Sequence, residues 1–418
     1  MKIKPESVGY PAHDSNLSLL VSADNQFTID VLKTLLLHDT KGEKKNVIIS
    51  PFNASQALSM LLFGSKAKTF TQLAQTLHYD KILKDISSLT PKNREMLHIT
   101  IKEMNAALTK LSKHVTLDIG NGLYPDSTFP LDSHYLDVIK GTYKAIVQNL
   151  NIAKDPRHAE KVINEDVAHA TKGMIENLLP PNNLDSTTRM LVIRGTLNIY
   201  IQIIEYYLTF KKISLTQKLP FISDDGHTQE IPMMQGYKSV NYAKINFSDH
   251  VGQEVEVLRL DYKDEELGMF FVLPRQNGLK QFIQDLNPER LNKLVKDLHL
   301  EKRIWISIPI FKRGYETKLL ETLQALGTHD IFGDNADLSG ISGNTKEKLC
   351  LTQVYHKAFI EVNEEGSQAG AGSGAIIGNT SIRDPVQFIA DKPFLYFIMD
   401  LVNGCILFIG TFASPILD

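Results

Sequence analysis

The sequence predicts an α+β protein in which helices and antiparallel strands share one domain. Two observations predict this class. Much of the first third of the chain carries apolar residues at helical spacing. The last third carries alternating segments and short apolar runs bounded by Gly and Pro, which are typical of strands. No linker or charge block divides the 418 residues, so we interpret residues 1–24 as an N-terminal extension and residues 25–418 as a single domain.

Three helices are predicted in the first part of the chain. Residues 25–38 place Phe27, Val31 and Leu35 on one helical face. Pro51 opens a second helix, at a position where its missing N–H removes no hydrogen bond. Residues 91–112 form a third helix, whose lysines alternate with glutamates. We interpret that polar face as solvated, with a glycosaminoglycan-binding face as the alternative.

Further elements are predicted toward the C-terminus. Residues 303–312 alternate like a strand, and residues 315–326 follow as a helix that ends at Gly327. Residues 356–363 form another strand. Two apolar strands, residues 393–399 and 405–410, complete the chain.

A run of small residues, 364–378, separates these last strands and is the most informative feature of the sequence. A compact domain rarely keeps so long a structureless loop unless that loop is functional or disordered. Every second residue from Ser367, including Ala369 and Ala371, is small and carries a Cβ, whereas the glycines occupy the other set. Because a strand has a period of two, the segment can exist as a loop and also as a strand buried on a packed core.

Composition and motifs argue against several functions. With 43% hydrophobic residues, a net charge of −3 and no long apolar stretch, the chain predicts neither nucleic-acid nor membrane binding. It contains no G-x-S-x-G, H-E-x-x-H, P-loop or C-x-x-C motif, so we expect no enzyme activity, no metal and no cofactor. Cys350 and Cys405 are interpreted as two buried thiols, with one disulfide as the alternative.

Seven segments, in order, resemble the serpin family, whose members are protease inhibitors. They run from about residue 25 to the C-terminus and are specific as a set. The segments are residues 46–69, 163–175, 231–234, 335–341, 359–367, 388–398 and 404–410. The resemblance implies the serpin fold, with three β-sheets, about nine helices and an exposed reactive-centre loop at about residues 364–387.

The resemblance also implies a mechanism, in which the protein is a suicide substrate. A protease cleaves the loop, residues 364–380 insert into the central sheet, and the acylated protease is trapped. The hinge residues implied are Glu364, Gly366, Ser367, Ala369 and Ala371.

A buried polar cluster beneath the central sheet, the shutter, is implied at Ser50, Asn53, Asn164 and His356. The family pattern Ser-Pro-x-Ser ends in Asn53 here, so its hydrogen bonds must be rearranged. The family's tryptophan at the top of the central sheet is missing, and the single Trp is Trp305 in another strand.

The scissile bond has three candidates. The usual interval from Glu364 places it at Thr380-Ser381, which suits an elastase-like or less selective serine protease. Gly378, preceded by apolar Ile377, would suit a papain-like cysteine protease. Arg383 would suit trypsin but is followed by an acidic residue.

The sequence leaves two interpretations open for the function and two for the location of the protein. Gly370 and Gly372 stand where the inhibitory members of the family usually have alanines. A non-inhibitory serpin with a carrier, storage or chaperone role is therefore the alternative interpretation. We expect a monomer whose partner is its target protease. The N-terminus has no apolar signal region, which fits a secreted protein without its leader or a cytoplasmic protein.

Overall fold

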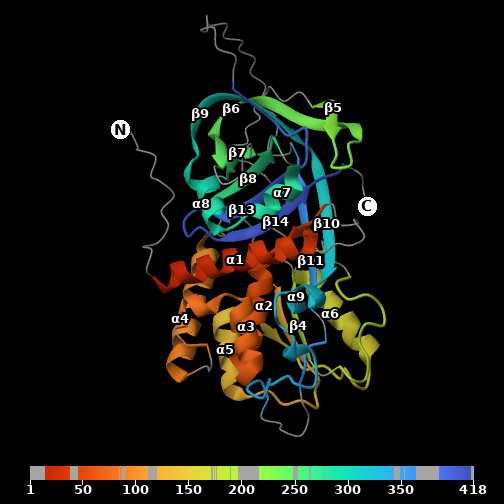
Figure 1. Cartoon of the computed structure of the whole chain (residues 1–418). Helices are drawn as coiled ribbons and strands as arrows, with labels where there is room; N and C mark the ends of the chain where they lie inside the picture. The colour runs from red at the N-terminus through yellow and green to blue at the C-terminus, as the bar shows by residue number, and fades with distance from the viewer. Residues whose placement is uncertain are drawn as a thin grey trace, which may run out of the picture.

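The structure is a computed structural model of the chain. It describes residues 15–37, 46–83, 85–86, 90–111, 120–170, 173, 175, 177–188, 190–195, 216–247, 253–262, 265–276, 278–342, 349–352, 354–363 and 386–415. Within these ranges the chain forms helices α1–α9 and strands β1–β14 in three hydrogen-bonded sheets (Figure 1). This arrangement has the α+β class that the sequence predicts.

The first six helices form most of one half of the molecule. Figure 1 shows α1 crossing the middle, with α2 to α5 gathered on one side of it and most strands on the other. The helix bounds are α1 Asn16–Leu37, α2 Pro51–Gly64, α3 Ala67–Thr76, α4 Pro91–Leu111, α5 Ser133–Tyr143, α6 Pro156–Ala170, α7 Gly278–Asp285, α8 Pro288–Lys296 and α9 Leu320–Ala325.

A nine-stranded mixed sheet forms the other half. Its order is β1-β14-β13-β8-β7-β6-β9-β12, and β5 pairs with β6. The bounds are β1 Ile48–Ile49, β5 Gln217–Ile222, β6 Thr228–Phe247, β7 Gln253–Asp261, β8 Leu267–Pro274, β9 His299–Pro309, β12 Val386–Ile389, β13 Phe394–Asp400 and β14 Ile406–Phe412.

Two smaller sheets complete the fold. One has the order β3-β2-β4, with bounds Ile146–Val147, Gly120–Pro125 and Met190–Gly195. The other is the antiparallel pair β10 (Phe311–Lys318) and β11 (Tyr355–Val362).

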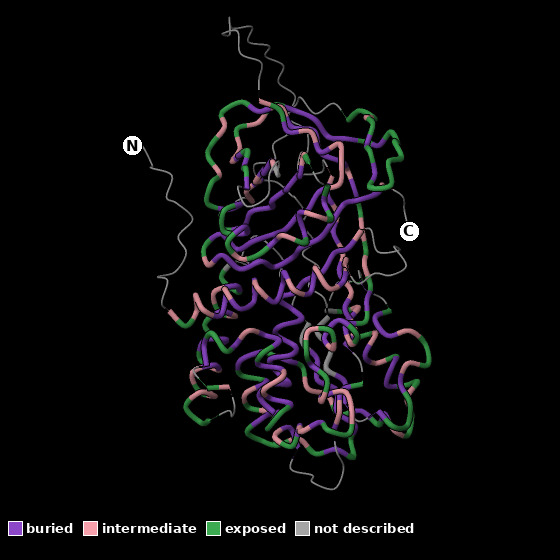
Figure 2. The backbone as a smooth tube through the Cα atoms, in the orientation of Figure 1, coloured by how far each residue is buried: buried purple, intermediate pink, exposed green. Residues whose placement is uncertain are grey.

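The core lies beneath these sheets, and α2 is its central helix. All residues of α2 are buried, and α2 packs against α1, β4 and β14 (Figure 2). Asn53-Ala54-Ser55 has the pattern of a glycosylation triplet, but burial on every side of α2 keeps it from being a surface site. Pro51 is the first residue of this helix, as the sequence predicts.

Two element boundaries differ from those predicted. Helix α1 begins at Asn16 rather than at residue 25. Residues 315–318, predicted to be helical, belong to β10, and α9 starts only at Leu320. The reason is a non-local partner, because β10 pairs with β11 from Phe311↔Val362 to Lys318↔Tyr355. These ladder hydrogen bonds outweigh a weak local helical period.

The cysteines and hydropathy agree with the sequence analysis. Cys350 and Cys405 are both free thiols; Cys405 is buried as the sequence predicts, whereas Cys350 is only half-buried. None of the helices in the described ranges has the length and apolarity to cross a bilayer.

Candidate functional site

The proposed reactive loop itself lies outside the described residues. This applies to the hinge residues and the candidate scissile bonds, namely Glu364, Gly366, Ser367, Ala369, Ala371, Gly378, Thr380, Ser381 and Arg383. The structure does describe both flanks of the loop. Strand β11 precedes it and ends at Val362, and β12 follows it from Val386. The site can therefore be examined from the surface that would receive the loop.

Strand β11 has a neighbour on each side but is hydrogen-bonded to only one of them. It pairs with β10 along its whole length. On its other side it lies close to β4, yet among the described strands β4 is laddered to β2 and not to β11. Among the described strands, the β3-β2-β4 and β10-β11 sheets are therefore two parts that no ladder joins, and we call the boundary between them the β4–β11 gap.

The two faces of β11 differ in burial. His356, Ala358, Ile360 and Val362 are buried, whereas the alternate side chains are half-buried. The buried set lies on the same core as β1 and α2. A strand added along β11 would consequently have one face against this core, where only small side chains fit beside existing ones.

His356 is held beneath the sheet by Ser50, the residue before α2. Its ring nitrogen Nε2 accepts a hydrogen bond from the Ser50 backbone N–H at 3.0 Å. The Ser50 hydroxyl in turn donates to the carbonyl oxygen of Leu407 on β14 at 2.8 Å. Burial lowers the pKa of His356 to about 4, so its imidazole is neutral at pH 7 and can serve as an acceptor. These hydrogen bonds connect β11, the residue before α2 and β14. Because the imidazole is buried and engaged in them, it is not placed to act as a general base.

Asn53 lies one turn further along α2 and does not join this chain of hydrogen bonds. Its side chain is 1% exposed, and neither amide atom has a hydrogen-bond partner within the described part of the structure. The same holds for the Gln56 amide one turn later. Two adjacent turns of the most buried helix thus carry unsatisfied polar groups, which are costly to bury.

Asn164, which the resemblance assigns to the shutter, bonds to the segment after α6. It lies on α6, where its amide donates to the carbonyl of Leu179 at 3.0 Å and accepts from the N–H of the same residue at 2.8 Å. Of the four residues assigned to the shutter, the structure joins Ser50 and His356 directly. Asn164 instead holds the segment that follows α6.

Sequence reasoning missed the part that α6 plays beside the gap. Helix α6 and the segment after it form a second hydrophobic cluster with Tyr124 of β2, Leu191 of β4 and Tyr355 of β11. Two tyrosine hydroxyls hold α6 and the segment after it, which together we call the α6 cover. Tyr124 donates to Asp166 at 3.0 Å, and Tyr355 donates to Asn183 at 3.0 Å. The anchors stand on opposite sides of the β4–β11 gap, so α6 and its following segment bridge it.

Glu160 of α6 also holds the segment that follows α6, through its backbone. Its carboxylate accepts hydrogen bonds from the backbone N–H of Leu184 at 2.7 Å and of Asn182 at 3.1 Å. Glu160 itself is buried. Tyr124 and Tyr355 are the signal that the sequence offers for this contact, because the hydroxyl of a tyrosine that packs against a core usually finds a hydrogen-bond partner.

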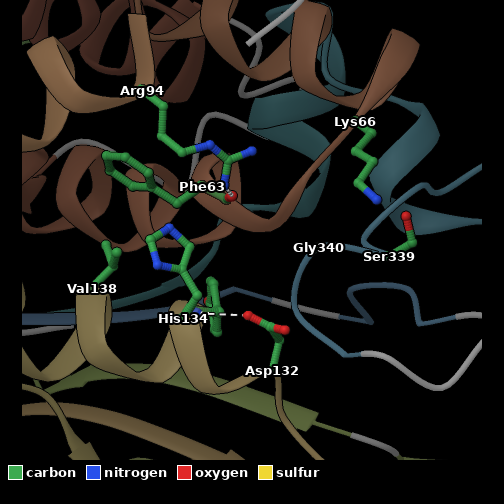
Figure 3. A pocket seen from close by; sticks show the side chains of 9 residues that line it. Phe63, Lys66, Arg94, Asp132, His134, Val138, Ser339 and Gly340 are labelled. Atoms are coloured by element: carbon green, nitrogen blue, oxygen red, sulfur yellow. Dashed lines mark hydrogen bonds between the residues drawn. The ribbon is translucent and has the colours of Figure 1, made fainter. Parts of the chain in front are cut away.

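A separate cavity of about 240 Å³ lies between α2, α4 and α5 (Figure 3). Arg94 and Lys66 contribute cations to it, but Arg94 already donates to the carbonyl of Phe63 at 3.0 Å. Asp132 caps α5 by accepting from the Tyr135 N–H at 2.9 Å. These contacts join helices, and we interpret the cavity as a structural junction. Across the described ranges, no group of three or more His, Cys, Asp and Glu side chains is placed to hold a metal ion.

The fold and the divided sheet define a class of protein, and sequence comparison agrees with it. The model of the Serpin (serine protease inhibitor) family matches residues 22–415, so the chain belongs to the serpin family. Among individual proteins, it is similar to a leukocyte elastase inhibitor of Homo sapiens, with 30% identity over 95% of this chain and 99% of the relative. It is similarly related to an ovalbumin of Dromaius novaehollandiae, at 29% identity over 94% and 99% of the two chains.

Solved structures agree on the fold. Native protease nexin-1, crystallised with heparin, matches with a TM-score of 0.78 at 24% identity and covers 96% of this chain and 100% of its own. Uncleaved ovalbumin matches with a TM-score of 0.76, also at 24% identity, over 95% and 100% of the chains. This chain therefore has the serpin fold along almost its whole length.

Proposed function

We propose that this serpin inhibits proteases as a suicide substrate, by inserting residues 364–380 into the β4–β11 gap after cleavage. The observation that carries the proposal is the division of the central sheet. β11 lacks a ladder partner on one edge among the described strands, and the chain that leaves this strand carries small residues at every second position. An inserted strand would join the two halves into one sheet and satisfy backbone groups along both edges.

The length and side chains of the segment suit this gap. At about 3.3 Å per residue, a strand of residues 364–380 extends about 50 Å, enough to run past the whole of β11. Ser367, Ala369 and Ala371 fall on one face of such a strand. They would lie beside the buried row of Ala358 and Ile360, where larger side chains would clash.

The uninserted form must then be held by a kinetic barrier, since the inserted form has more hydrogen bonds. The cover formed by α6 supplies a physical basis for part of it. A strand entering the gap has to displace the segment fastened by Tyr124 and Tyr355.

An elastase-like serine protease is the first target that we propose. Cleavage at Thr380-Ser381 suits such an enzyme, because Thr380 lacks the charge that a trypsin-like pocket requires. The relatives named leukocyte elastase inhibitor support the same choice. The alternatives are a papain-like enzyme that cuts after Gly378, where apolar Ile377 precedes the cleaved bond, and trypsin cutting after Arg383.

A non-inhibitory role is the second candidate function. Gly370 and Gly372 lose more conformational entropy than alanine when they become part of a strand. This costs roughly 0.5–1 kcal/mol of free energy for each glycine and would slow insertion. One relative of comparable identity is an ovalbumin, which is not named for a protease. Such a protein would be cleaved in the loop without trapping the enzyme.

The test is to incubate the protein with elastase, papain and trypsin, separate the products on denaturing gels, and weigh the released C-terminal fragment. We expect a covalent band with elastase and a fragment that begins at Ser381. A fragment beginning at Asn379 or Asp384 would move the scissile bond. Clean cleavage by all three, with no covalent band and no gain in thermal stability, would contradict inhibition.

We also propose that the protein is secreted and monomeric, with a cytoplasmic location as the alternative. Asn246, which begins an Asn-Phe-Ser triplet, is exposed on β6 and could accept a glycan in a secretory compartment. A glycosidase-sensitive mass on native protein would support secretion, and light scattering would report the oligomeric state.

A further inference from the structure

An exposed aromatic and cationic cluster lies on β6 and β9, and the mechanism above does not use it. Tyr237 and Trp305 are paired across these strands, with ring centroids 4.9 Å apart in an edge-to-face arrangement. The Arg303 guanidinium lies 4.6 Å from the centroid of the Tyr237 ring. We call these three residues the β9 cluster.

The β9 cluster is accessible and preorganised. Tyr237 is 38% exposed, Trp305 is half-buried and Arg303 is exposed. None of the described carboxylates forms an ion pair with Arg303, so its charge has no acidic partner in that part of the fold. Stacking fixes the guanidinium before any partner arrives, which reduces the entropy lost on binding.

The cluster also has the composition of a binding hot spot. Trp, Tyr and Arg are the residue types that most often dominate protein–protein affinity, because each buries a large area and retains a polar group. Isolated exposed aromatic residues are common, but two aromatic rings in contact with each other and with an arginine on one sheet face are not explained by core packing. They serve better as an interaction surface.

Its position indicates the partner. Trp305 is in register with Gln387 on β12, the strand that follows the reactive loop. Five residue steps separate Ser381 from Val386, so the proposed scissile bond lies within about 18 Å of the start of β12. A protease of about 220 residues has a radius of gyration of about 17 Å. An enzyme holding that bond in its cleft must therefore extend over the neighbouring strands.

We propose that the β9 cluster is a second contact site for the target protease, outside the reactive loop. The matching surface beside the protease cleft would present a carboxylate to Arg303 and an apolar side chain to the two rings. The proposal rests on the proposed function, because it takes the loop-bound protease as its occupant. Contact with the β9 cluster would add selectivity among proteases that the small residues of the loop do not provide.

The test compares Arg303→Glu and Trp305→Ala with Lys140→Glu. Lys140 is exposed on α5, which lies at the other end of the molecule from β6 and β9 (Figure 1), and its reversal changes the net charge as Arg303→Glu does. The rate constant for loop cleavage by elastase is measured for each variant, whether or not a covalent band forms. We expect roughly a tenfold decrease for the two cluster variants and no change for the control.

The covalent band and the cleavage rate separate the two proposals. If the wild type forms no covalent band, that result contradicts inhibition. If all variants are cleaved at equal rates, that result overturns the β9 cluster as a contact site. The stoichiometry of inhibition should be unchanged in the cluster variants, because they alter encounter and not insertion. Melting curves must show that each variant is folded, and Trp305→Phe replaces the alanine variant if that one is not.

Fluorescence supplies a readout independent of turnover. Trp305 is the single tryptophan of the chain. Binding of elastase whose active-site serine is replaced by alanine should produce an emission change that Trp305→Phe lacks. An identical change with both proteins would overturn the proposal, as would a wild type that self-associates through this face while Arg303→Glu does not.

Discussion

The backbone N–H of Ser50 donates a hydrogen bond to Nε2 of His356 at 3.0 Å, and so joins segments 306 positions apart in the sequence. The imidazole must be unprotonated at Nε2 to accept this bond. Ser50 lies between β1 and α2, and His356 lies on the strand beside the β4–β11 gap. The protonation state of one buried ring is therefore linked to the stability of the sheet edge that would receive the loop.

Stability should fall in acid because of His356. Its pKa is about 4 in the folded protein and about 6.5 in the unfolded chain. Between these values only the unfolded chain binds the proton, so the free energy of unfolding decreases as the pH falls from 6.5, by about 3 kcal/mol at pH 4. Urea unfolding at pH 7 and pH 4.5 measures this decrease. In His356→Gln, which retains an acceptor but does not titrate, the decrease should be smaller. Equal decreases would contradict the assignment.

Ser367→Arg should convert the inhibitor into a substrate. If residues 364–380 insert with Ser367 on the buried face, an arginine there places an unpaired charge in the core, which is very costly. We expect normal melting of the intact protein and normal cleavage, but loss of the covalent band. Gln368→Arg, on the opposite face, is the matched control and should retain it. A covalent band from Ser367→Arg would disprove insertion through this hinge.

Asn53→Leu should stabilise the protein. It removes two buried amide atoms that lack partners in the described structure, while it nearly preserves volume. We expect the free energy of unfolding to rise by about 1–2 kcal/mol. Asn164→Leu is the contrasting variant, because it leaves the backbone groups of Leu179 unpaired, and it should be destabilising by a similar amount. Destabilisation by both variants would show that Asn53 has a partner in solution, such as a buried water.

Tyr124→Phe and Tyr355→Phe should make loop insertion faster. Each removes one hydroxyl that fastens α6 or its following segment beside the gap, a change worth about 1 kcal/mol. The rate at which cleaved protein gains heat resistance measures insertion. Tyr135→Phe, which removes a hydrogen bond to the Met60 carbonyl instead, should lower stability without changing that rate. An equal effect of all three variants would indicate general destabilisation.

Local chemistry explains which elements the sequence could predict. Pro51 begins α2 because proline suits the first turn of a helix, and Tyr355–Val362 alternates because a strand on a core buries every second residue. Residues 315–318 were predicted wrongly because their helical period is local, whereas their strand pairing depends on β11, some forty residues later. Similarly, the sequence placed Asn164 with His356 only by resemblance, and the fold gives its amide to Leu179.

The sequence alone determined the class of the protein, and it predicts the small-residue hinge and the burial of His356, because periodicity, residue size and family motifs are properties of the chain itself. The tertiary structure alone decided what surrounds them. It placed β4 beside β11 without a ladder, set α6 across the gap, left the Asn53 amide unsatisfied and brought Arg303 onto Tyr237 beside β12. Each of these features depends on contacts between segments far apart in the chain, and only the packed fold brings those segments together.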